Sequence, residues 1–274
     1  MAVRTDFSSM HNHTVFADGK NTVREMVQAA FEQGVKHFGI SEHSPFPAFP
    51  EGGMRMEDVS RYVAEMRQAR EEYRGRMEVY TGLEQDIDSP AITEDFDYVI
   101  GSVHFIQRGG KYYPIDYSEE IFLKILEEVF LGDIHAFVQE YYHRVSEVVK
   151  ITNCDIIGHF DLITKYNEND RLFSTNEEFY RTCVQDALDI LVPENRIFEV
   201  NSGAISRGYR KTPYPQKWIL EELCKRRAKI TLNADAHHRD NILFGYDEMI
   251  KLVKDCGFTE IMVMSQGAWI PVKL

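Results

Sequence analysis

Asp-Phe-Ser-Ser-Met-His-Asn-His, residues 6–13, is the stretch from which both the fold and the site of this chain can be predicted. Its mixture of apolar and polar residues predicts a short strand, and residues two apart in a strand point to the same side. His11 and His13 would therefore project into one site, with Asn12 facing away. Neutral imidazole is the commonest protein metal ligand, although a single His-x-His pair also arises by chance. Further His, Asp and Glu residues later in the chain support the interpretation of this pair as metal ligands.

The rest of the chain alternates between strand-like and helix-like segments. This alternation predicts a mainly parallel sheet with helical crossovers, in the α/β class. Seven strand-helix units and a terminal strand fit a closed or nearly closed barrel, and an open doubly wound sheet is the alternative. No GxGxxG follows the first strand, so a Rossmann cofactor site is not expected. The predicted strands are 6–13, 37–43, 77–83, 98–104, 154–159, 196–201, 229–235 and 259–265, and the predicted helices are 22–33, 57–73, 118–131, 134–150, 175–191, 215–226 and 244–256.

Length and charge limit the possible functions. A chain of 274 residues is a common length for a one-domain α/β barrel, and no internal boundary is visible. The net charge of -13 argues against nucleic acid and anionic membranes as partners, because both require a basic surface. An acidic protein that binds an anionic substrate also needs a local source of positive charge.

The cysteines and the N-terminus predict a cytoplasmic protein. The four cysteines form no Cys-x-x-Cys pair and suit a reducing compartment. The first six residues are too polar for a signal peptide, and no apolar run approaches the roughly 18 residues of a membrane span. No pattern in the sequence indicates an oligomeric state.

Side chains that bind metals recur where the predicted strands end. In a β/α barrel the carboxyl ends of the strands converge on one face, which carries the chemistry. Any one of these residues has a simpler explanation, such as a buried, hydrogen-bonded histidine or a helix N-cap. Such explanations are much less expected for all of them together, so the set predicts a metal site. The residues are His11, His13, His43, Glu84, His104, His159, Glu199, Asn201, Asp235 and His237.

The size of this set predicts more than one metal ion. A tetrahedral ion uses three or four protein ligands and keeps a position for water. A mixed nitrogen and oxygen set without thiolates favours Zn, Mn or Fe(II). Clustered ions lower the pKa of a bound water and stabilise the attacking and leaving oxygens of phosphoryl transfer. They would also supply the positive charge that an acidic protein needs to hold a phosphate.

The ordered motifs resemble those of the PHP (polymerase and histidinol phosphatase) superfamily. Within it, Gly-Ser-Val-His-Phe, Tyr-Pro-Ile-Asp-Tyr and Glu-Val-Asn-Ser-Gly resemble the stand-alone histidinol-phosphate phosphatases, cytoplasmic enzymes of histidine biosynthesis. The resemblance implies a distorted (β/α)7 TIM-like barrel over residues 1–274, with the metal site at the carboxyl ends of the strands. The motifs are His11-Asn12-His13, Ser41-Glu42-His43, Gly82-Leu83-Glu84, Gly101-Ser102-Val103-His104, Gly158-His159 and Asp235-Ala236-His237.

The resemblance also implies a trinuclear centre of divalent Zn, Mn or Fe ions. Asp18 precedes Gly19, which by itself would indicate a turn, but the resemblance makes Asp18 a ligand. Glu84 would be shared between two ions. The implied ligands are His11, His13, Glu84 and Asp235 for one ion, Glu84, His104 and His159 for the second, and Asp18, His43 and His237 for the third.

The implied reaction is hydrolysis of L-histidinol phosphate to L-histidinol and phosphate, with a metal-bridging hydroxide attacking phosphorus in line. A related phosphoesterase acting on a nucleotide or sugar phosphate is one alternative. A non-catalytic, metal-stabilised binding module is another. Asp161 and His238 are candidates for the acid that protonates the leaving oxygen, and a supporting role around the ligands is the other interpretation of each.

Arginine suits phosphate because its fork binds two oxygens at once. Arg207 and Arg210 follow the sixth strand, and Arg207 is the first candidate for binding the phosphate. Ser202, in the same loop, is a further substrate-binding candidate. The spacing of the arginines departs from the family pattern, and a solvated surface pair is the alternative. Lys165 and Arg171 follow the fifth strand and could also reach a phosphate.

Other conspicuous residues have plainer interpretations. His135 and His143 share a face of a predicted helix and are expected to be solvated, whereas His37 begins a strand at the non-catalytic end. The aromatic residues of 46–49 and 112–113 follow the second and fourth strands. They would either form a wall of the pocket or cover the mouth of the barrel.

Overall fold

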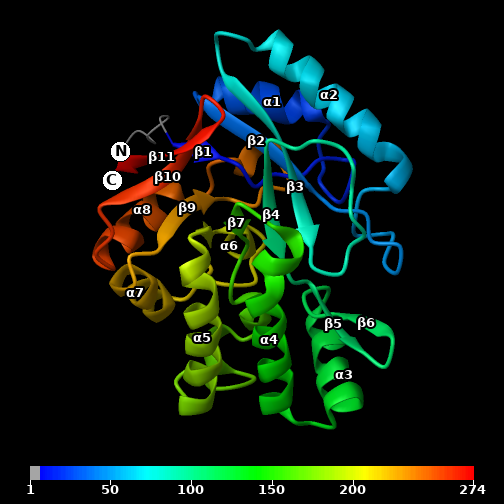
Figure 1. Cartoon of the computed structure of the whole chain (residues 1–274), viewed down its shortest axis with the longest axis vertical. Coiled ribbons are helices and arrows are strands. Elements are labelled where there is room, and N and C mark those ends of the chain that lie inside the picture. The colour runs from blue at the N-terminus through cyan, green and yellow to red at the C-terminus, as the bar shows by residue number, and fades with distance from the viewer. Residues whose placement is uncertain (1–6) are drawn as a thin grey trace.

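Seven parallel strands form a nearly closed barrel in the computed structural model, which describes residues 7–274 (Figure 1). Their order is β1-β2-β3-β4-β7-β8-β9. The first and last strands meet at their carboxyl ends, where Asn12 and Ala236 form a parallel bridge. The N–H of His13 donates to the Ala236 carbonyl at 2.9 Å. The strands are β1 (Ser8–Ser9), β2 (His37–His43), β3 (Glu78–Asp86), β4 (Tyr98–Ser102), β7 (Ile156–Ile157), β8 (Ile197–Asn201) and β9 (Lys229–Asn233).

Two predicted strands are much shorter in the structure. The stretch 6–13 keeps only Ser8–Ser9 and the bridge at Asn12, and Asp6 lies outside the described residues. The stretch 154–159 keeps only Ile156–Ile157. The N–H of His159 donates to the side-chain oxygen Oε2 of Glu199, in β8, at 2.9 Å instead of to a backbone carbonyl of that strand. Regular backbone pairing in β1 and β7 therefore ends just before the histidines whose side chains point into the site.

Helices surround the barrel, and each of the seven predicted helices is confirmed to within a few residues. In α1, Thr22 and Glu25 form a capping box, in which each side chain accepts from the other residue's N–H. The short helix α6 was not predicted. The helices are α1 (Val23–Glu32), α2 (Val59–Glu72), α3 (Glu119–Phe130), α4 (Ile134–Thr152), α5 (Glu178–Leu191), α6 (Gly203–Ser206), α7 (Lys217–Lys225) and α8 (Tyr246–Asp255).

The predicted strand 259–265 does not join the barrel wall. It forms β10 (Glu260–Ser265), which pairs antiparallel with β11 (Ala268–Lys273) beside the chain termini (Figure 1). Gln266 and Gly267 between them have φ values of 50° and 75°, the geometry of a tight hairpin turn. The expectation of a terminal barrel strand is therefore wrong, because a turn at 266–267 folds the chain back on itself.

This hairpin closes the amino-terminal end of the barrel. Met262 and Met264 of β10 are buried in a cluster with inward-facing residues of the strands. At the turn, the N–H of Gln266 donates to Glu78 Oε2 at 3.1 Å, at the start of β3. Apolar side chains therefore fill the amino-terminal end of the barrel, and the polar groups lie at its carboxyl end. The other members of the cluster are Met10, Tyr80, Tyr98, Ile100, Ile156 and Ile197.

A second hairpin was also missed by the sequence. β5 (Phe105–Arg108) and β6 (Lys111–Pro114) pair antiparallel directly after His104. Gly109 and Gly110 form its turn with φ values of 57° and 75°. The hairpin lies beside α3 at the carboxyl end of the barrel, where it contributes to the wall of the site (Figure 1).

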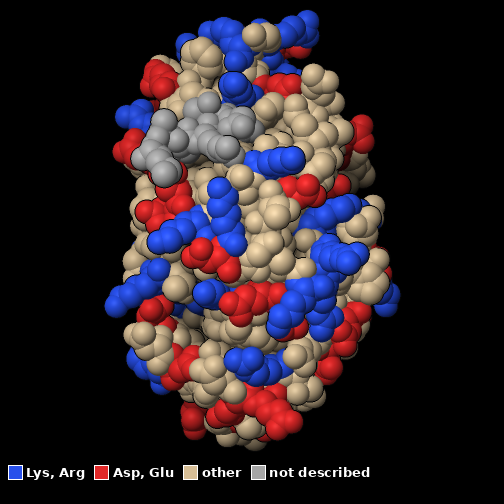
Figure 2. Space-filling model, turned by 90° about the vertical axis from the view of Figure 1, so that its left-hand side faces the viewer, with Lys and Arg blue, Asp and Glu red and all other residues tan. Residues whose placement is uncertain are grey.

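None of the helices within residues 7–274 combines the length and the apolar content that crossing a bilayer requires. The polar N-terminal stretch that argued against a signal peptide lies outside the described residues. On the face drawn in Figure 2, the described Lys and Arg side chains are interspersed with Asp and Glu. That face therefore lacks the continuous basic surface that nucleic acid requires.

Two glycines make room for a tyrosine inside the barrel. Tyr98 crosses the interior and donates its hydroxyl hydrogen to the Met10 carbonyl. A Cβ atom on Gly82 would lie 2.6 Å from Tyr98 Cε2, well inside van der Waals contact. Gly39 would crowd the same ring. Neither position therefore tolerates a side chain without moving the tyrosine.

We expect Gly82→Ala to lower the free energy of unfolding by about 1–3 kcal/mol, the usual cost of overpacking a core. Urea unfolding of the metal-free protein measures this. Gly52→Ala is the matched control, because a Cβ there meets nothing within 4 Å, and its unfolding free energy should stay within about 0.5 kcal/mol. Equal stability of the two variants would contradict the packing described.

Candidate metal centre

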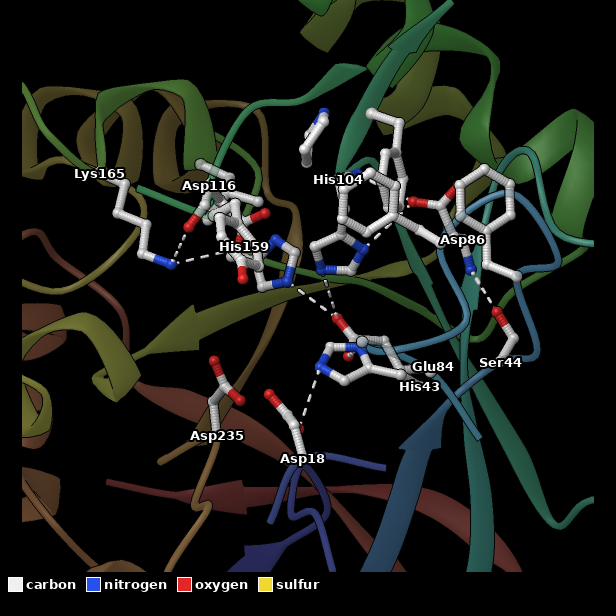
Figure 3. Close-up of a pocket in the computed structure, with 18 of the residues that line it drawn as sticks. Asp18, His43, Ser44, Glu84, Asp86, His104, Asp116, His159, Lys165 and Asp235 are labelled. Atoms are coloured by element: carbon white, nitrogen blue, oxygen red, sulfur yellow. Dashed lines mark hydrogen bonds and ion pairs between the residues drawn. The ribbon is translucent and has the colours of Figure 1, made fainter. Parts of the chain in front are cut away.

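A cavity of about 340 Å³ opens at the carboxyl ends of the strands. Acidic and imidazole side chains line its floor, and aromatic side chains form part of its wall. Figure 3 shows the side chains of His43, Glu84, His104 and His159 converging, with Asp18 and Asp235 close below them. The strand ends therefore bring the predicted ligands into one site, as the sequence led us to expect.

Four atoms on this floor surround one point. Glu84 Oε2 lies 3.2 Å from His11 Nε2 and 3.6 Å from His13 Nε2. Asp235 Oδ1 lies 3.7 Å and 3.2 Å from the same two nitrogens. None of the four atoms has a hydrogen-bond partner among the described residues, although all are buried. Tetrahedral ligands at the usual zinc distance of about 2.1 Å are about 3.4 Å apart, which is close to these four nitrogen–oxygen distances. The donor atoms of His11, His13 and Glu84 lie within 4.8 Å of one another and could hold a metal ion, with Asp235 beside them.

The other oxygen of Glu84 faces a second group of imidazoles. Glu84 Oε1 lies 2.9 Å from His159 Nε2 and 3.3 Å from His104 Nε2. The hydroxyl of Ser102 donates to the same oxygen at 2.7 Å and fixes the orientation of the carboxylate. One carboxylate thus presents its two oxygens to two neighbouring groups of nitrogens, which is the geometry that a bridging ligand needs.

A third group lies nearer the solvent. Asp18 Oδ1 is 3.1 Å from His237 Nε2 and 3.7 Å from His43 Nε2. The register of β2 and β3 places His43 opposite Glu84, and His43 Nδ1 is 2.7 Å from Glu84 Oε2. Asp18, His43 and His237, together with His13, form a group whose donor atoms lie within 4.8 Å of one another. Asp18 is therefore part of the cluster and not only a turn residue.

The charges of the cluster suit divalent cations. Burial, together with the neighbouring His43 and His237, lowers the pKa of His13 to about 3, which leaves its imidazole neutral. Burial raises the pKa of Glu84, but the imidazoles of His43 and His11 outweigh burial and hold that pKa well below its usual range. The site therefore places the neutral imidazole of His13 beside the buried carboxylate charge of Glu84.

Two further carboxylates orient the imidazoles from behind. Glu199 Oε1 accepts from His11 Nδ1 at 2.6 Å, which turns Nε2 toward the cluster. Asp86 Oδ2 lies 3.1 Å from His104 Nδ1 and accepts from the His104 N–H at 2.8 Å. Such contacts fix the tautomer and the angle of a metal-binding histidine. The sequence had placed Glu199 at a strand end but missed Asp86, whose position two residues after Glu84 was the available signal.

Neither candidate acid lies at the cavity. Asp161 is fully buried, and its Oδ2 accepts from the N–H of Gln216 at 3.1 Å. His238 is displaced outward, where its Nδ1 accepts from the N–H of Asp240 at 3.3 Å at the start of a 3₁₀ turn. Neither residue lines the cavity. The structure thus favours the supporting role for both residues, because the chain turns away from the site after His159 and His237.

Two of the predicted substrate-binding residues also lie outside the cavity. Arg210 is buried and donates to the carbonyl oxygen of Thr164 at 3.2 Å. Ser202 is buried and donates to the Phe244 carbonyl at 2.6 Å. Arg210 is thus neither a solvated surface residue nor a direct contact for a ligand. Arg171 is exposed and forms a two-pronged ion pair with Glu119 away from the cavity.

Two cations do line the cavity. Arg207 Nη2 donates to Asp235 Oδ2 at 3.0 Å, and its Nη1 lies 2.8 Å from His237 Nδ1. Gly203 allows this approach, because a Cβ there would be 2.6 Å from Asp235 Oδ2. Lys165 reaches the cavity from the loop after β7. Arg207 and Lys165 thus bring positive charge to the lining of the cavity.

The wall of the cavity contains Asp116, to which the sequence assigned no role, and two of the aromatic residues that were expected either there or over the mouth of the barrel. Asp116 follows β6, and its Oδ2 lies 3.2 Å from Lys165 Nζ. Burial raises the pKa of Asp116, but Lys165 outweighs burial and lowers it, so the carboxylate is charged. The aromatic residues Phe46 and Phe49 form part of the wall with Phe105. Tyr112 packs behind Phe46 instead of lining the cavity.

The chain is similar to known proteins over most of its length. The family model described as PHP domain matches residues 9–203, a range that contains seven of the nine predicted ligands. A protein of Schizosaccharomyces pombe named probable histidinol-phosphatase is 27% identical, over 94% of this chain and 90% of that protein. The histidinol-phosphatase of Bacillus subtilis is 26% identical, over 88% of this chain and 97% of that protein.

A crystal structure shows the same fold. Histidinol phosphate phosphatase from Lactococcus lactis, complexed with zinc, L-histidinol and phosphate, matches with a TM-score of 0.72 and 22% identity. The match covers 96% of this chain and 98% of that one. The distorted seven-stranded barrel predicted from the sequence is thereby confirmed.

Proposed function

This chain belongs to the PHP domain family, and we propose that it is a metal-dependent phosphatase that hydrolyses L-histidinol phosphate to L-histidinol and phosphate. One observation carries the proposal: seven of the nine predicted ligands line a cavity that also presents Arg207 and Lys165, and the other two, His11 and His13, lie buried against Glu84 and Asp235. The names of the curated relatives support the choice of substrate.

We propose that the floor binds three divalent ions. Four unpartnered atoms of His11, His13, Glu84 and Asp235 would hold the first. Glu84, His104 and His159 would hold the second, and Asp18, His43 and His237 the third. When bound, such ions lower the pKa of a water molecule and neutralise phosphate oxygens. Zinc is one candidate and Mn and Fe are others, because the donor set contains imidazole and carboxylate but no thiolate.

The chain itself supplies the remaining contacts to the phosphate. Arg207 lies against Asp235 and His237, so its guanidinium borders the floor on one side. Lys165 borders the cavity from the preceding crossover, which follows β7. Positive charge from two loops would hold a phosphate over the cluster and orient it for attack.

The wall suits the rest of L-histidinol phosphate, which carries an ammonium group and an imidazole ring. The charged carboxylate of Asp116 is placed to accept from the ammonium group. The aromatic wall of Phe46, Phe49 and Phe105 offers flat apolar surface to the ring. A nucleotide or sugar phosphate has no ammonium group, so the wall favours the amino alcohol ester.

We expect Asp116→Asn to lower kcat/KM for L-histidinol phosphate by about 10- to 100-fold, the value of one charge-assisted hydrogen bond. The loss should be less than about threefold for 3-(imidazol-4-yl)propyl phosphate, which has the ring but no ammonium group. Steady-state kinetics with both esters measures the difference. Equal losses on the two substrates would assign Asp116 a structural role instead.

A panel of phosphate monoesters tests the substrate itself. L-Histidinol phosphate should have the highest kcat/KM among esters that include nucleotides and sugar phosphates. If a nucleotide or a sugar phosphate has the higher kcat/KM, that ester replaces L-histidinol phosphate as the substrate, and the proposed phosphatase activity is retained. Complete lack of hydrolysis by the metal-loaded protein would leave a binding module. We further propose that residues 1–274 act as one domain in the cytoplasm, on a small phosphate ester.

A further inference from the structure

We propose that Arg210 is a positioning residue that fixes Arg207 and Lys165 relative to each other. The inference rests on the proposed function, in which these two cations hold the substrate phosphate. They come from different crossovers of the barrel: Lys165 follows β7, whereas Arg207 follows β8. Both residues lie several positions beyond the ends of their strands. We therefore expect contacts between the two crossovers to determine the distance between Lys165 and Arg207.

Arg210 makes that contact with one guanidinium group. Its Nη1 donates to the carbonyl oxygen of Thr164 at 3.2 Å and also to the Thr164 hydroxyl. Its Nη2 donates to the Thr212 hydroxyl at 3.2 Å, within its own crossover. Thr164 directly precedes Lys165, and Arg207 lies one turn before Arg210. The side chain thus joins the two backbone segments that carry the pocket cations.

The surroundings of Arg210 indicate a buried contact with a fixed geometry and not a mobile contact at the surface. Only 7% of the residue is exposed, and its guanidinium carbon lies 4.7 Å from the centre of the Tyr214 ring. Asp161 is buried nearby, and attraction to Arg210 lowers its pKa against the larger, opposing effect of burial. A buried guanidinium needs hydrogen bonds and opposite charge, and both crossovers contribute them here.

The loop around Arg210 is anchored on either side of this contact. At its base, the N–H of Asn201 donates to the Tyr214 carbonyl at 2.7 Å, and the reverse bond is 2.9 Å. Farther along, Lys165 Nζ lies 4.9 Å from the centre of the Tyr209 ring, next to Arg210. The loop also meets the segment after Lys165 through the N–H of Lys211, which donates to Glu168 Oε2 at 3.2 Å, and through the packing of Tyr209 on Tyr166. Removing Arg210 leaves these contacts and the base in place and removes the hydrogen bonds to Thr164, the residue directly before Lys165.

Arg210→Gln tests this inference, with Thr164→Val as a milder second variant that removes the hydroxyl group, which accepts from Arg210 and donates to the Asp161 carbonyl, and keeps the backbone carbonyl acceptor. We expect Arg210→Gln to raise both KM and the inhibition constant of inorganic phosphate roughly tenfold, since small misplacements of binding groups cost this much or more. Metal content by elemental analysis and the unfolding midpoint should show that the variant is folded and loaded. Thr164→Val should shift both constants in the same direction by about two- to threefold.

A double-mutant cycle separates positioning from general destabilisation. In a Lys165→Ala background, Arg210→Gln should change the phosphate inhibition constant by less than about twofold, because one of the two cations is already missing. The same tenfold change in both backgrounds, or no change in either constant, would overturn the inference. Arg171→Ala, which removes an exposed cation from the same crossover, is the control and should leave both constants unchanged.

These outcomes are distinguishable from a failure of the proposed function. The cycle can be run with any phosphate monoester that the protein hydrolyses and with inorganic phosphate as the inhibitor. If the wild-type protein hydrolyses no phosphate ester, the proposed function fails first. If it does and the cycle shows no coupling, only the role of Arg210 is lost.

Discussion

Glu84→Gln is expected to reduce hydrolysis by at least about 10³-fold, which corresponds to about 4 kcal/mol of transition-state stabilisation. The two oxygens of Glu84 face two separate groups of imidazoles, and both contacts depend on its negative charge. In the glutamine, one of these oxygens becomes an NH₂ group, which cannot bind a cation. Elemental analysis of the purified variant should therefore show the loss of at least one metal ion per chain, together with the loss of activity.

Variants of two other glutamates, Glu199 and Glu119, provide the comparison for Glu84→Gln. Glu199→Gln should lower metal affinity by about 10- to 100-fold, because Glu199 acts on the cluster indirectly, through His11 Nδ1 and the His159 N–H. Glu119→Gln removes an exposed carboxylate that pairs with Arg171 and should leave activity unchanged. A Glu84→Gln variant that is fully loaded with metal and active would contradict the assignment of the bridging carboxylate.

Removal of metal is expected to abolish hydrolysis completely and to lower stability. Chelation with EDTA followed by dialysis should leave no activity, and addition of Mn or Zn should restore it. The carboxylates of Glu84 and Asp235 are buried, and in the metal-free protein Arg207 and the neighbouring imidazoles offset their charge in place of divalent ions. Binding to the folded state alone stabilises a protein by about 4 kcal/mol when the free metal is at 1,000 times its Kd. Thermal unfolding with and without metal measures this difference.

The two readouts distinguish an enzyme from a binding module. An enzyme loses activity and stability together, and regains both when metal is added. A module would show the change in stability with no hydrolysis of any phosphate ester in either state. Hydrolysis that continues at full rate after complete chelation would refute the metal-dependent mechanism.

The metal cluster could be predicted from the sequence because its spacing follows backbone geometry. His11 and His13 point to one side through the two-residue repeat of an extended chain, and the ends of parallel strands meet at one rim. Asn12, between them, does face away and donates to the Gly39 carbonyl at 2.8 Å. Asp18 required the family resemblance, because its side chain reaches the cluster from a loop whose path has no periodic signature.

The surroundings of the cluster were predicted less well, for two physical reasons. Arginine has a long side chain, so the nearness of Arg210 in sequence to Arg207 does not determine which of them faces the cavity. Asp116 reaches the wall only because the β5–β6 hairpin turns the chain back at Gly109-Gly110. Such a turn is a local event, and its consequence for a distant cavity depends on tertiary packing.

The closure of the barrel between Asn12 and Ala236 constrains when the protein can acquire its metals. The first proposed ion site would combine His11 and His13 with Asp235, which lies 222 positions after His13 in the sequence. Synthesis proceeds at about 5–20 residues per second, so His11 and His13 are made well before Asp235. The site can therefore be complete only after the segment that contains Asp235 has been made and has folded against β1, and metal loading is expected to follow that step.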